Sequence, residues 1–239
     1  MNLVKNYLFS LIKNSYLQND KNIRSFMDKN DEASVVDLGC DDGIRTKKMG
    51  LFIGTKKLFG VEVVKKRLHL AKKRGVIVSE CNLNNVLPFR RNSFDVVHSN
   101  QVIEHLYDTD TFVQEIFRIL KPGAYAIIST ENLSSWHNIF ALLLGFQPFS
   151  MTNFSNRGNI GNPLALWNGK ITKNSAIKSW QHNRLFSYRG LTDLFNKHGF
   201  DIERVKTSGY YPLPGFFSKI DPLHGHWIAI KVRKPKEKK

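Results

Sequence analysis

The chain has 239 residues, enough for one large α/β domain with a continuous core, whereas two full domains would be tight. Its hydrophobic fraction of 41% and charged fraction of 23% are ordinary for a folded soluble protein. The net charge of +16 predicts either an anionic partner or a basic, solvated surface, and the scattered placement of the basic residues favours the surface. Two cysteines argue against a disulfide framework and against a zinc site.

The N-terminal segment and the longest apolar run bear on localisation. Residues 1–30 have apolar side chains at helical spacing, interrupted by lysines, and lack the cleavage site of a signal peptide. The apolar run at 139–146 is too short to span a bilayer. Together these features predict a cytoplasmic protein.

Short β-rich runs alternate with helical patterns along the first 131 residues. After one or two amphipathic helices in residues 1–30, we predict strands at 34–38, 58–61, 76–79, 94–98 and 125–130, and helices at 44–53, 63–74 and 110–120. The last of these helices is stopped by Lys121-Pro122-Gly123. Such alternation is typical of a parallel, doubly wound sheet.

Regularity breaks down after residue 131. Residues 134–149 have helical apolar spacing, whereas 150–180 form a long irregular insertion, which is usually functional or mobile. Order returns with a predicted helix at 187–197 and strands at 200–207 and 226–232. We therefore predict one domain over residues 1–239, made of N-terminal helices (1–30), a core (34–131), an insertion or lid (132–185), a segment that completes the sheet (186–233) and a basic tail (234–239).

The most informative stretch is residues 35–43, VVDLGCDDG. An apolar strand ends in an acidic residue and turns through Gly39 and Gly43 into a helix, as in a nucleotide-binding βα unit. A dinucleotide site needs glycine at two further positions, which here hold Asp41 and Ile44. Carboxylates at the turn would repel a pyrophosphate, but they would tolerate a ligand with a sulfonium and an ammonium group. S-adenosylmethionine (SAM) is such a ligand.

Polar side chains also follow the next predicted strands. Glu62 comes just after the second strand, where an acidic side chain can accept hydrogen bonds from both ribose hydroxyls. Asn82 and Leu83 follow the third strand, where an amide could pair with the adenine edge and an apolar side chain could pack on the ring. The predicted SAM site consists of Asp37, Gly39, Cys40, Asp41, Gly43, Glu62, Val63, Asn82, Leu83, Asn100 and Gln101.

The wider pattern resembles the class I SAM-dependent methyltransferases of the "methyltransferase domain 11" type. The motifs that carry the resemblance are LPF (87–89), SFDVV (93–97), VIEHL (102–106) and ILKPG (119–123), together with those above, over residues 34–131. It implies a Rossmann-like, seven-stranded, mostly parallel sheet with helices on both faces and an antiparallel last strand. The chain departs from the family at Asp41 and Ala124, where glycine is usual, and at Asn82, where aspartate is usual.

The resemblance also indicates a base. His105 follows the fourth strand on the face where the family places the methyl group, and a histidine at the matching position takes part in catalysis in the phosphoethanolamine methyltransferases. A hydroxyl or ammonium acceptor must lose a proton during transfer, so we predict His105 as the catalytic residue. A helix-packing histidine is the alternative. Asp221, His224 and His226 are weakly patterned as metal ligands, and we predict no metal.

Three functions remain open from the sequence. The favoured one is in-line methyl transfer from SAM to a small-molecule, glycan or lipid-linked acceptor, as in cell-surface polysaccharide biosynthesis. An RNA methyltransferase acting on ribose or ring nitrogen is the second, which the charge favours but the motifs after the fourth strand do not. A non-catalytic SAM-fold binding protein is the third. Peripheral membrane contact through residues 139–144 is an alternative to their packing under the lid, which we favour.

The acceptor site is expected to use residues outside the core. In this fold acceptor specificity comes from the N-terminal helices, the segment after the fifth strand and the C-terminal loops. The expected residues are Tyr7, Tyr16, Glu131, Asn132, Trp167, Trp180, His182, Arg184, Tyr210, Tyr211, Asp221, His224 and His226.

Overall fold

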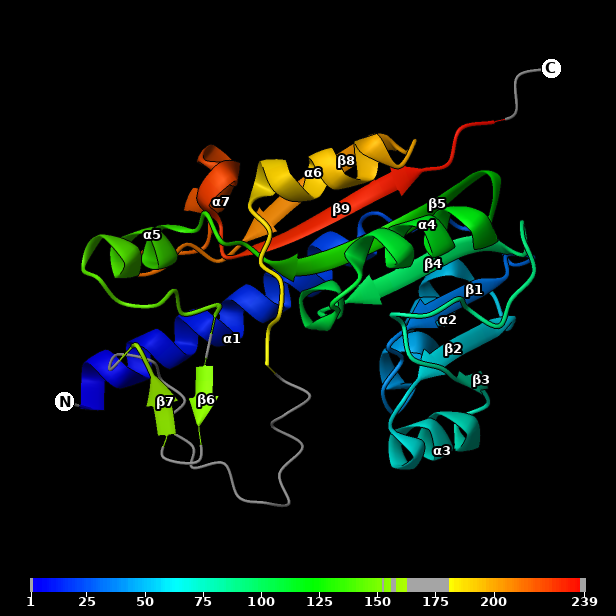
Figure 1. Cartoon of the computed structure of the whole chain (residues 1–239), viewed down its shortest axis with the longest axis horizontal. Coiled ribbons are helices and arrows are strands. Elements are labelled where there is room, and N and C mark those ends of the chain that lie inside the picture. The colour runs from blue at the N-terminus through cyan, green and yellow to red at the C-terminus, as the bar shows by residue number, and fades with distance from the viewer. Residues whose placement is uncertain (1, 152, 156–157, 163–180, 237–239) are drawn as a thin grey trace.

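A computed structural model describes residues 2–151, 153–155, 158–162 and 181–236, and its centre is a seven-stranded sheet (Figure 1). The strands are β1 (Val35–Leu38), β2 (Leu58–Glu62), β3 (Ile77–Glu80), β4 (Phe94–Asn100), β5 (Leu120–Glu131), β8 (Asp201–Ser208) and β9 (Trp227–Arg233). Their order is β3-β2-β1-β4-β5-β9-β8. β9 pairs antiparallel with both β5 and β8, while the other adjacent strands pair parallel, so the predicted fold class and the direction of the last strand are confirmed.

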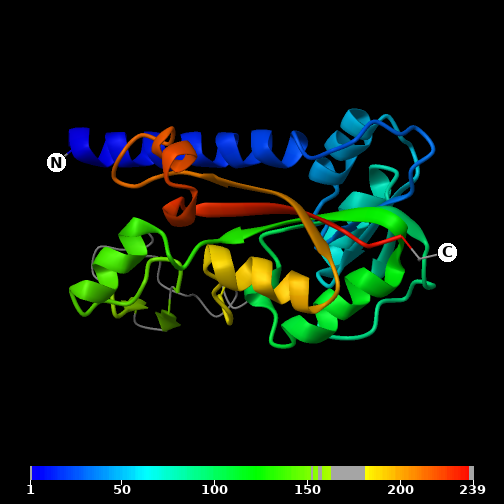
Figure 2. The same ribbon diagram turned by 90° about the horizontal axis from the view of Figure 1, so that it is seen from above.

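Helices cover both faces of the sheet (Figure 2). They are α1 (Asn2–Arg24), α2 (Ile44–Ile53), α3 (Lys65–Lys73), α4 (Thr109–Ile119), α5 (Trp136–Leu143), α6 (Tyr188–Lys197) and α7 (Phe217–Ile220), with short 3₁₀ turns η1 (Ile103–His105) and η3 (Pro222–His224). A hairpin of β6 (Asn153–Ser155) and β7 (Gly158–Ile160) lies in the insertion. The helices α1 and α2 lie on one face of the sheet, while α4 and α6 lie on the other.

Side chains alternate between the two faces of the sheet along each strand, so a hydrophobic core forms on each face. Val35 clusters with Phe26, which follows α1, on one face, while Val36 clusters with Phe112 of α4 on the other, because successive strand residues point to opposite sides. The central strands are therefore apolar on both faces, as parallel strands between two helical layers must be. Each fully buried side chain of this size stabilises the fold by about 1.5–3 kcal/mol.

The fifth strand begins earlier than the sequence indicated. The helix α4 ends at Ile119, one residue before the predicted end, and β5 starts at Leu120 rather than Tyr125, so Lys121-Pro122-Gly123 lies within the strand. Leu120 pairs with Phe94, and the register then shifts before Val96 pairs with Tyr125. Gly123 takes a φ of +80° at this irregularity, where its amide donates to the Lys234 carbonyl.

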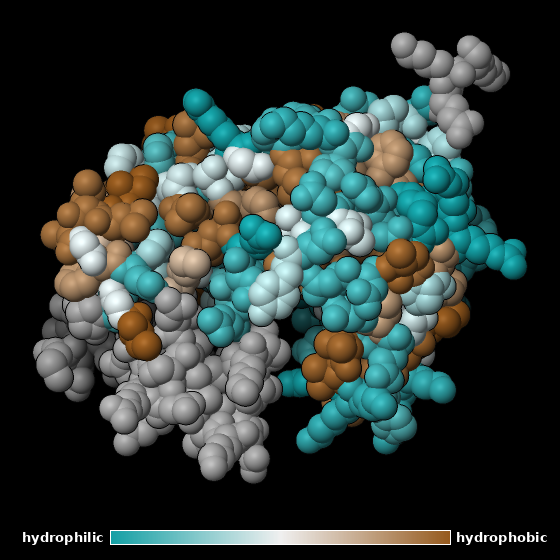
Figure 3. Space-filling view, viewed as in Figure 1, coloured by the Kyte–Doolittle hydropathy of each residue, from teal (hydrophilic) through white to brown (hydrophobic). Residues whose placement is uncertain are grey.

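The predicted packing of α5 is wrong for much of its surface. Ala141 is buried, but Phe140, Leu142, Leu143 and Leu144 are exposed, and Figure 3 shows apolar side chains gathered over this part of the molecule. Among the described residues, none of the helices combines the length and apolar character needed to cross a membrane.

Candidate functional site

A cavity of about 500 Å³ opens at the carboxyl ends of β1 and β4, under α1 and α2. The strand order reverses between these two strands, which is the point where open α/β sheets bind ligands. Its lining includes Asp20, Arg24, Asp37, Gly39, Cys40, Asp41, Arg45, Lys48, Met49, Phe52, His98 and Asn100.

The cavity gathers five of the predicted site residues, namely Asp37, Gly39, Cys40, Asp41 and Asn100. The others lie outside its lining: Gly43, Glu62, Val63, Asn82, Leu83, Gln101 and His105. The structure therefore assembles the part of the predicted site around β1 and β4 in one space, whereas the predicted residues after β2 and β3 do not line it.

The turn after β1 has the left-handed backbone that its glycines permit. Gly39 has a φ of +80°, and a Cβ there would lie 2.5 Å from Val102 Cγ2. Asp41 has a φ of 48°, a region that aspartate tolerates better than most residues, so it replaces the family's glycine without changing the turn. The Glu62 carboxylate accepts hydrogen bonds from the Asp41 amide (3.1 Å) and the Val63 amide (2.9 Å). Glu62 therefore ties the turn to the end of β2.

The two carboxylates of the turn, exposed Asp41 and partly buried Asp42, are paired with arginines within the protein. Asp41 lies 3.1 Å from Arg67, and Asp42 lies 3.5 Å from Arg74. Both arginines come from the α3 region, whose basic side chains were not linked to the turn by their sequence position. The buried carboxylate at the cavity is that of Asp37, which is 2% exposed.

Asp37 is held by two hydrogen bonds. Its Oδ2 accepts from the Thr46 hydroxyl at 2.6 Å, and its Oδ1 lies 2.7 Å from His98 Nδ1. Next to it, Cys40 is buried, and burial together with the Asp37 charge raises the pKa of its thiol to about 12. Cys40 therefore keeps a protonated thiol in the cavity wall.

The residues after β3 engage their own neighbours. The Asn82 side-chain oxygen accepts from the Asn84 amide at 3.0 Å. Leu83 is 8% exposed and packs in the core on the α4 side of the sheet. Their predicted contacts with an adenine ring remain predictions.

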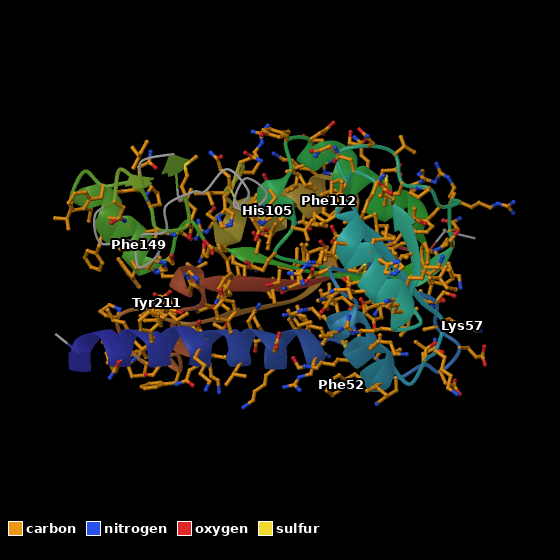
Figure 4. All side chains as sticks on the ribbon, turned by 90° about the horizontal axis from the view of Figure 1, so that it is seen from below. Phe52, Lys57, His105, Phe112, Phe149 and Tyr211 are labelled. Carbon is orange, nitrogen blue, oxygen red and sulfur yellow. The ribbon has the colours of Figure 1, made fainter. Side chains whose placement is uncertain are left out.

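A second cluster of titratable groups lies beyond the carboxyl end of β4, on the side of the sheet that carries α6. Figure 4 shows His105 there, on the face opposite Phe52 at the cavity. The His105 Nδ1 lies 3.1 Å from the Gln181 carbonyl oxygen, which can only accept. Nδ1 therefore carries the proton, and Nε2 is the ring's proton acceptor. Burial lowers the pKa of His105, which keeps the ring neutral at pH 7.

Two glutamates belong to this cluster: Glu104 is fully buried, and Glu131 is largely buried and lies 3.8 Å from His182. Burial raises the pKa of Glu104 to about 8 and that of Glu131 to about 7. Glu104 accepts from the Thr130 hydroxyl at 2.9 Å, and its Oε1 has no partner among the described residues. One ligand atom each of Glu104, His105 and His182 lies within 4.8 Å of the others, so these three could hold a metal ion, a grouping that the prediction of no metal did not include.

The predicted acceptor residues are only partly brought together here. His182 contacts the His105 ring at 4.9 Å between centroids, and His226 lies 3.0 Å from His137 with its own ring against Tyr211. By contrast, Asp221 and His224 pair with each other at 2.8 Å, next to Trp136. Trp167 and Trp180 lie outside the described residues.

Replacing Glu104 by Gln is expected to flatten the pH dependence of stability. A carboxyl whose pKa rises to about 8 on folding stabilises the folded state below its ordinary value of 4.5 and loses this contribution as pH rises through 8. The variant should therefore gain stability relative to the parent between pH 5 and 9, by about 1.4 kcal/mol per unit of pKa difference at most. Urea unfolding across this range measures it, and parallel curves for both proteins would contradict it.

Comparison with known proteins agrees with this geometry. A family model described as "Methyltransferase domain" matches residues 36–128. The ubiquinone biosynthesis O-methyltransferase of Rattus norvegicus is 24% identical over 208 residues, which cover 83% of this chain and 53% of that enzyme. The chain thus spans about half the length of this relative. A probable SAM-dependent methyltransferase of Mycolicibacterium smegmatis is 52% identical over 46 residues, covering 19% of this chain and 18% of that protein.

Solved structures of similar fold also include methyltransferases. A crystal structure of a SAM-dependent methyltransferase from Thermotoga maritima superimposes with a TM-score of 0.60 at 21% identity, covering 98% of this chain and 96% of that one. Residues 36–128 thus match the methyltransferase domain family, and the fold is that of the SAM-dependent methyltransferases. The cofactor of this methyltransferase family is SAM, as the sequence predicted.

The residues present fit that cofactor. His98 Nε2 and Asn100 Oδ1 are buried, have no partner among the described residues and belong to side chains that line the cavity. The neighbouring Gln101 Nε2 is also buried without a partner, and its backbone has a φ of 58°. Orphaned polar atoms and a strained backbone gather in functional sites because a ligand supplies the missing hydrogen bonds.

His98, Glu104 and the grouping of His182 with His105 were not among the predicted site residues. His98 was read only as part of a strand, although it precedes Asn100 by two residues and so shares its face. His182 lies in the irregular insertion, where no periodicity predicts its position. The amides of Asn183 and Arg184 donate to the Glu104 carbonyl and fix this segment against η1.

Proposed function

We propose that this protein transfers a methyl group from SAM to the hydroxyl group of a small acceptor molecule. The observation that carries the proposal is the state of His105. Its Nδ1 is committed to the Gln181 carbonyl and its pKa is lowered by burial, so the ring is neutral and can take a proton through Nε2. A hydroxyl acceptor has such a proton to lose, and general base catalysis of this kind contributes about 10²–10⁴-fold.

Bound SAM would supply a methyl group already activated by its positively charged sulfur. The protein's residues provide the rest. The segment from Asn100 to His105 runs from the cavity to the His105 cluster, so one short stretch of chain connects the cofactor side with the acceptor side. His182 packs against the base, and the carbonyl of Gln181 fixes its orientation. Orientation of this kind lowers the entropic part of the barrier.

The curated relative supports an oxygen acceptor of small size. The Rattus norvegicus enzyme is named an O-methyltransferase of ubiquinone biosynthesis, and it covers most of this chain's length. A more specific version of this proposal is that the acceptor is a glycan or a lipid-linked molecule. The exposed apolar side chains of α5 would suit a lipid-linked molecule, since they lie on the chain between β5 and the insertion.

Methyl transfer is tested by incubating the purified protein with labelled SAM and separated cell fractions that contain small molecules, lipids, glycans or RNA. Label is expected in a small-molecule or lipid fraction, and Asp37→Ala provides the blank because it removes the buried carboxylate of the cavity. Label found only in RNA would replace the proposal with the RNA alternative. No label in any fraction, with SAM bound, would favour the non-catalytic alternative.

A further inference from the structure

Asp37 and His98 form a buried pair at the base of the cavity. They are register partners in the adjacent strands β1 and β4, and they are 2% and 1% exposed. The Asp37 Oδ1 lies 2.7 Å from His98 Nδ1, while its Oδ2 accepts from Thr46. Both oxygens of this carboxylate therefore have partners within the protein.

The pairing fixes which ring nitrogen of His98 carries the proton. A carboxylate only accepts hydrogen bonds, so Nδ1 donates to it, which leaves Nε2 as the ring nitrogen that can accept. This Nε2 is buried and has no partner in the part of the chain that the structure describes. The same holds for Asn100 Oδ1, on the next residue of β4 that faces the same side. Both side chains line the cavity.

Two unpartnered acceptors in one cavity indicate a ligand group that donates. A buried acceptor left without a partner costs about 1–3 kcal/mol, which a donating ligand would recover. An ammonium group has three N–H donors and a positive charge, so it can serve both atoms and is favoured by the nearby Asp37 carboxylate. A carboxylate group would face these acceptors unfavourably. The basic Arg24 and Lys48, which also line the cavity, suit such a group better.

We propose that His98 Nε2 and Asn100 Oδ1 bind the α-ammonium group of the methyl donor, and that Asp37 acts as a positioning residue through His98. The inference rests on the proposed function, since it assigns a contact to its cofactor. It changes the role predicted for Asp37, whose carboxylate holds the imidazole rather than the ligand.

The test is calorimetry with three ligands: S-adenosylhomocysteine, its analogue without the α-amino group, and methylthioadenosine, which lacks the whole amino-acid end. His98→Asn keeps an amide near the Nδ1 position, so that it can still donate to Asp37, but it removes Nε2. Loss of one hydrogen bond to a charged group predicts that S-adenosylhomocysteine binds about 10–100-fold more weakly. The deaminated analogue and methylthioadenosine should bind as they do to the parent. His69→Asn, on exposed helix α3, is the matched control.

Two results would overturn the inference. Equal weakening of all three ligands would show that His98 only supports the cavity's structure, and unchanged binding of S-adenosylhomocysteine would show that Nε2 makes no contact. His98→Gln, whose amide oxygen can reach the Nε2 position, should restore part of the affinity for the amino ligand alone. A parent protein that binds neither S-adenosylhomocysteine nor methylthioadenosine would instead overturn the proposed function itself.

Asp37→Asn supplies an independent variant should His98→Asn not fold. Its amide can donate to Nδ1, which moves the ring proton to Nε2 and turns the acceptor into a donor. The affinity for S-adenosylhomocysteine should then fall about 10–100-fold, with that for methylthioadenosine unchanged. Nitrogen NMR of the His98 imidazole reports which ring nitrogen carries the proton. If Asp37 were merely structural, this tautomer would be the same in the variant as in the parent. An unchanged tautomer together with unchanged affinity would overturn the positioning role.

Discussion

His105→Ala is expected to lower kcat for a hydroxyl acceptor by about 10²–10⁴-fold, because it removes the base that takes the acceptor's proton. The dissociation constant for S-adenosylhomocysteine should stay within about twofold, since His105 lies outside the cavity lining. Single-turnover rates with labelled SAM measure the chemical step, and His69→Ala controls for the loss of an imidazole from the protein.

The pH profile adds a second readout to this experiment. Since burial lowers the pKa of His105, the parent's activity should persist below pH 6.5 before the base becomes protonated. The His105→Ala variant should instead gain activity as pH rises, because hydroxide or an ionised acceptor replaces the missing base. A variant with parental kcat and pH profile would leave His105 as the packing histidine that the sequence allowed.

The fold was predictable because its determinants are local. The helix α2 has the predicted bounds, 44–53, since Gly43 and Gly54 flank it with φ values of 80° and 97° that only glycine adopts readily. Strand residues such as Val35 and Val36 read as apolar regardless of what packs on them. The start of β5 was missed because Pro122 and Gly123 normally end regular structure, and the pairing of Leu120 with Phe94 is a tertiary effect.

The site was predictable only where its residues follow strands. Asp37 and Asn100 were identified because the carboxyl ends of parallel strands converge at one edge of the sheet. What their side chains touch was not, since the pairing of Asp37 with His98 depends on the register between β1 and β4. The approach of His182 to His105 depends on the path of an aperiodic insertion. The ends of strands therefore predict where site residues lie, whereas their side-chain contacts depend on strand register and on the path of loops.

Alanine substitutions at Gly43, in the turn after β1, and at Gly75, after α3, can separate the cost of backbone strain from the cost of close packing. Both have positive φ values, 80° and 78°, so alanine at either position incurs left-handed strain of about 1–2 kcal/mol. A Cβ at Gly75 has nothing within 4 Å, whereas one at Gly43 would lie 2.9 Å from Ala71 Cα in α3.

Gly43→Ala is therefore expected to lower the free energy of unfolding by about 2–5 kcal/mol, because overpacking adds about 1–3 kcal/mol to the strain. Gly75→Ala should lower it by the strain alone. Urea unfolding of both variants measures the difference, and equal losses would contradict the close packing of the turn on α3. The Gly43 variant should also bind S-adenosylhomocysteine more weakly, because the turn that must shift contains Gly39, Cys40 and Asp41 of the cavity wall. Gly75 lies outside that wall, so its variant should keep the parental affinity. Comparing the two variants therefore tests whether the packing of this turn against α3 affects binding of the cofactor.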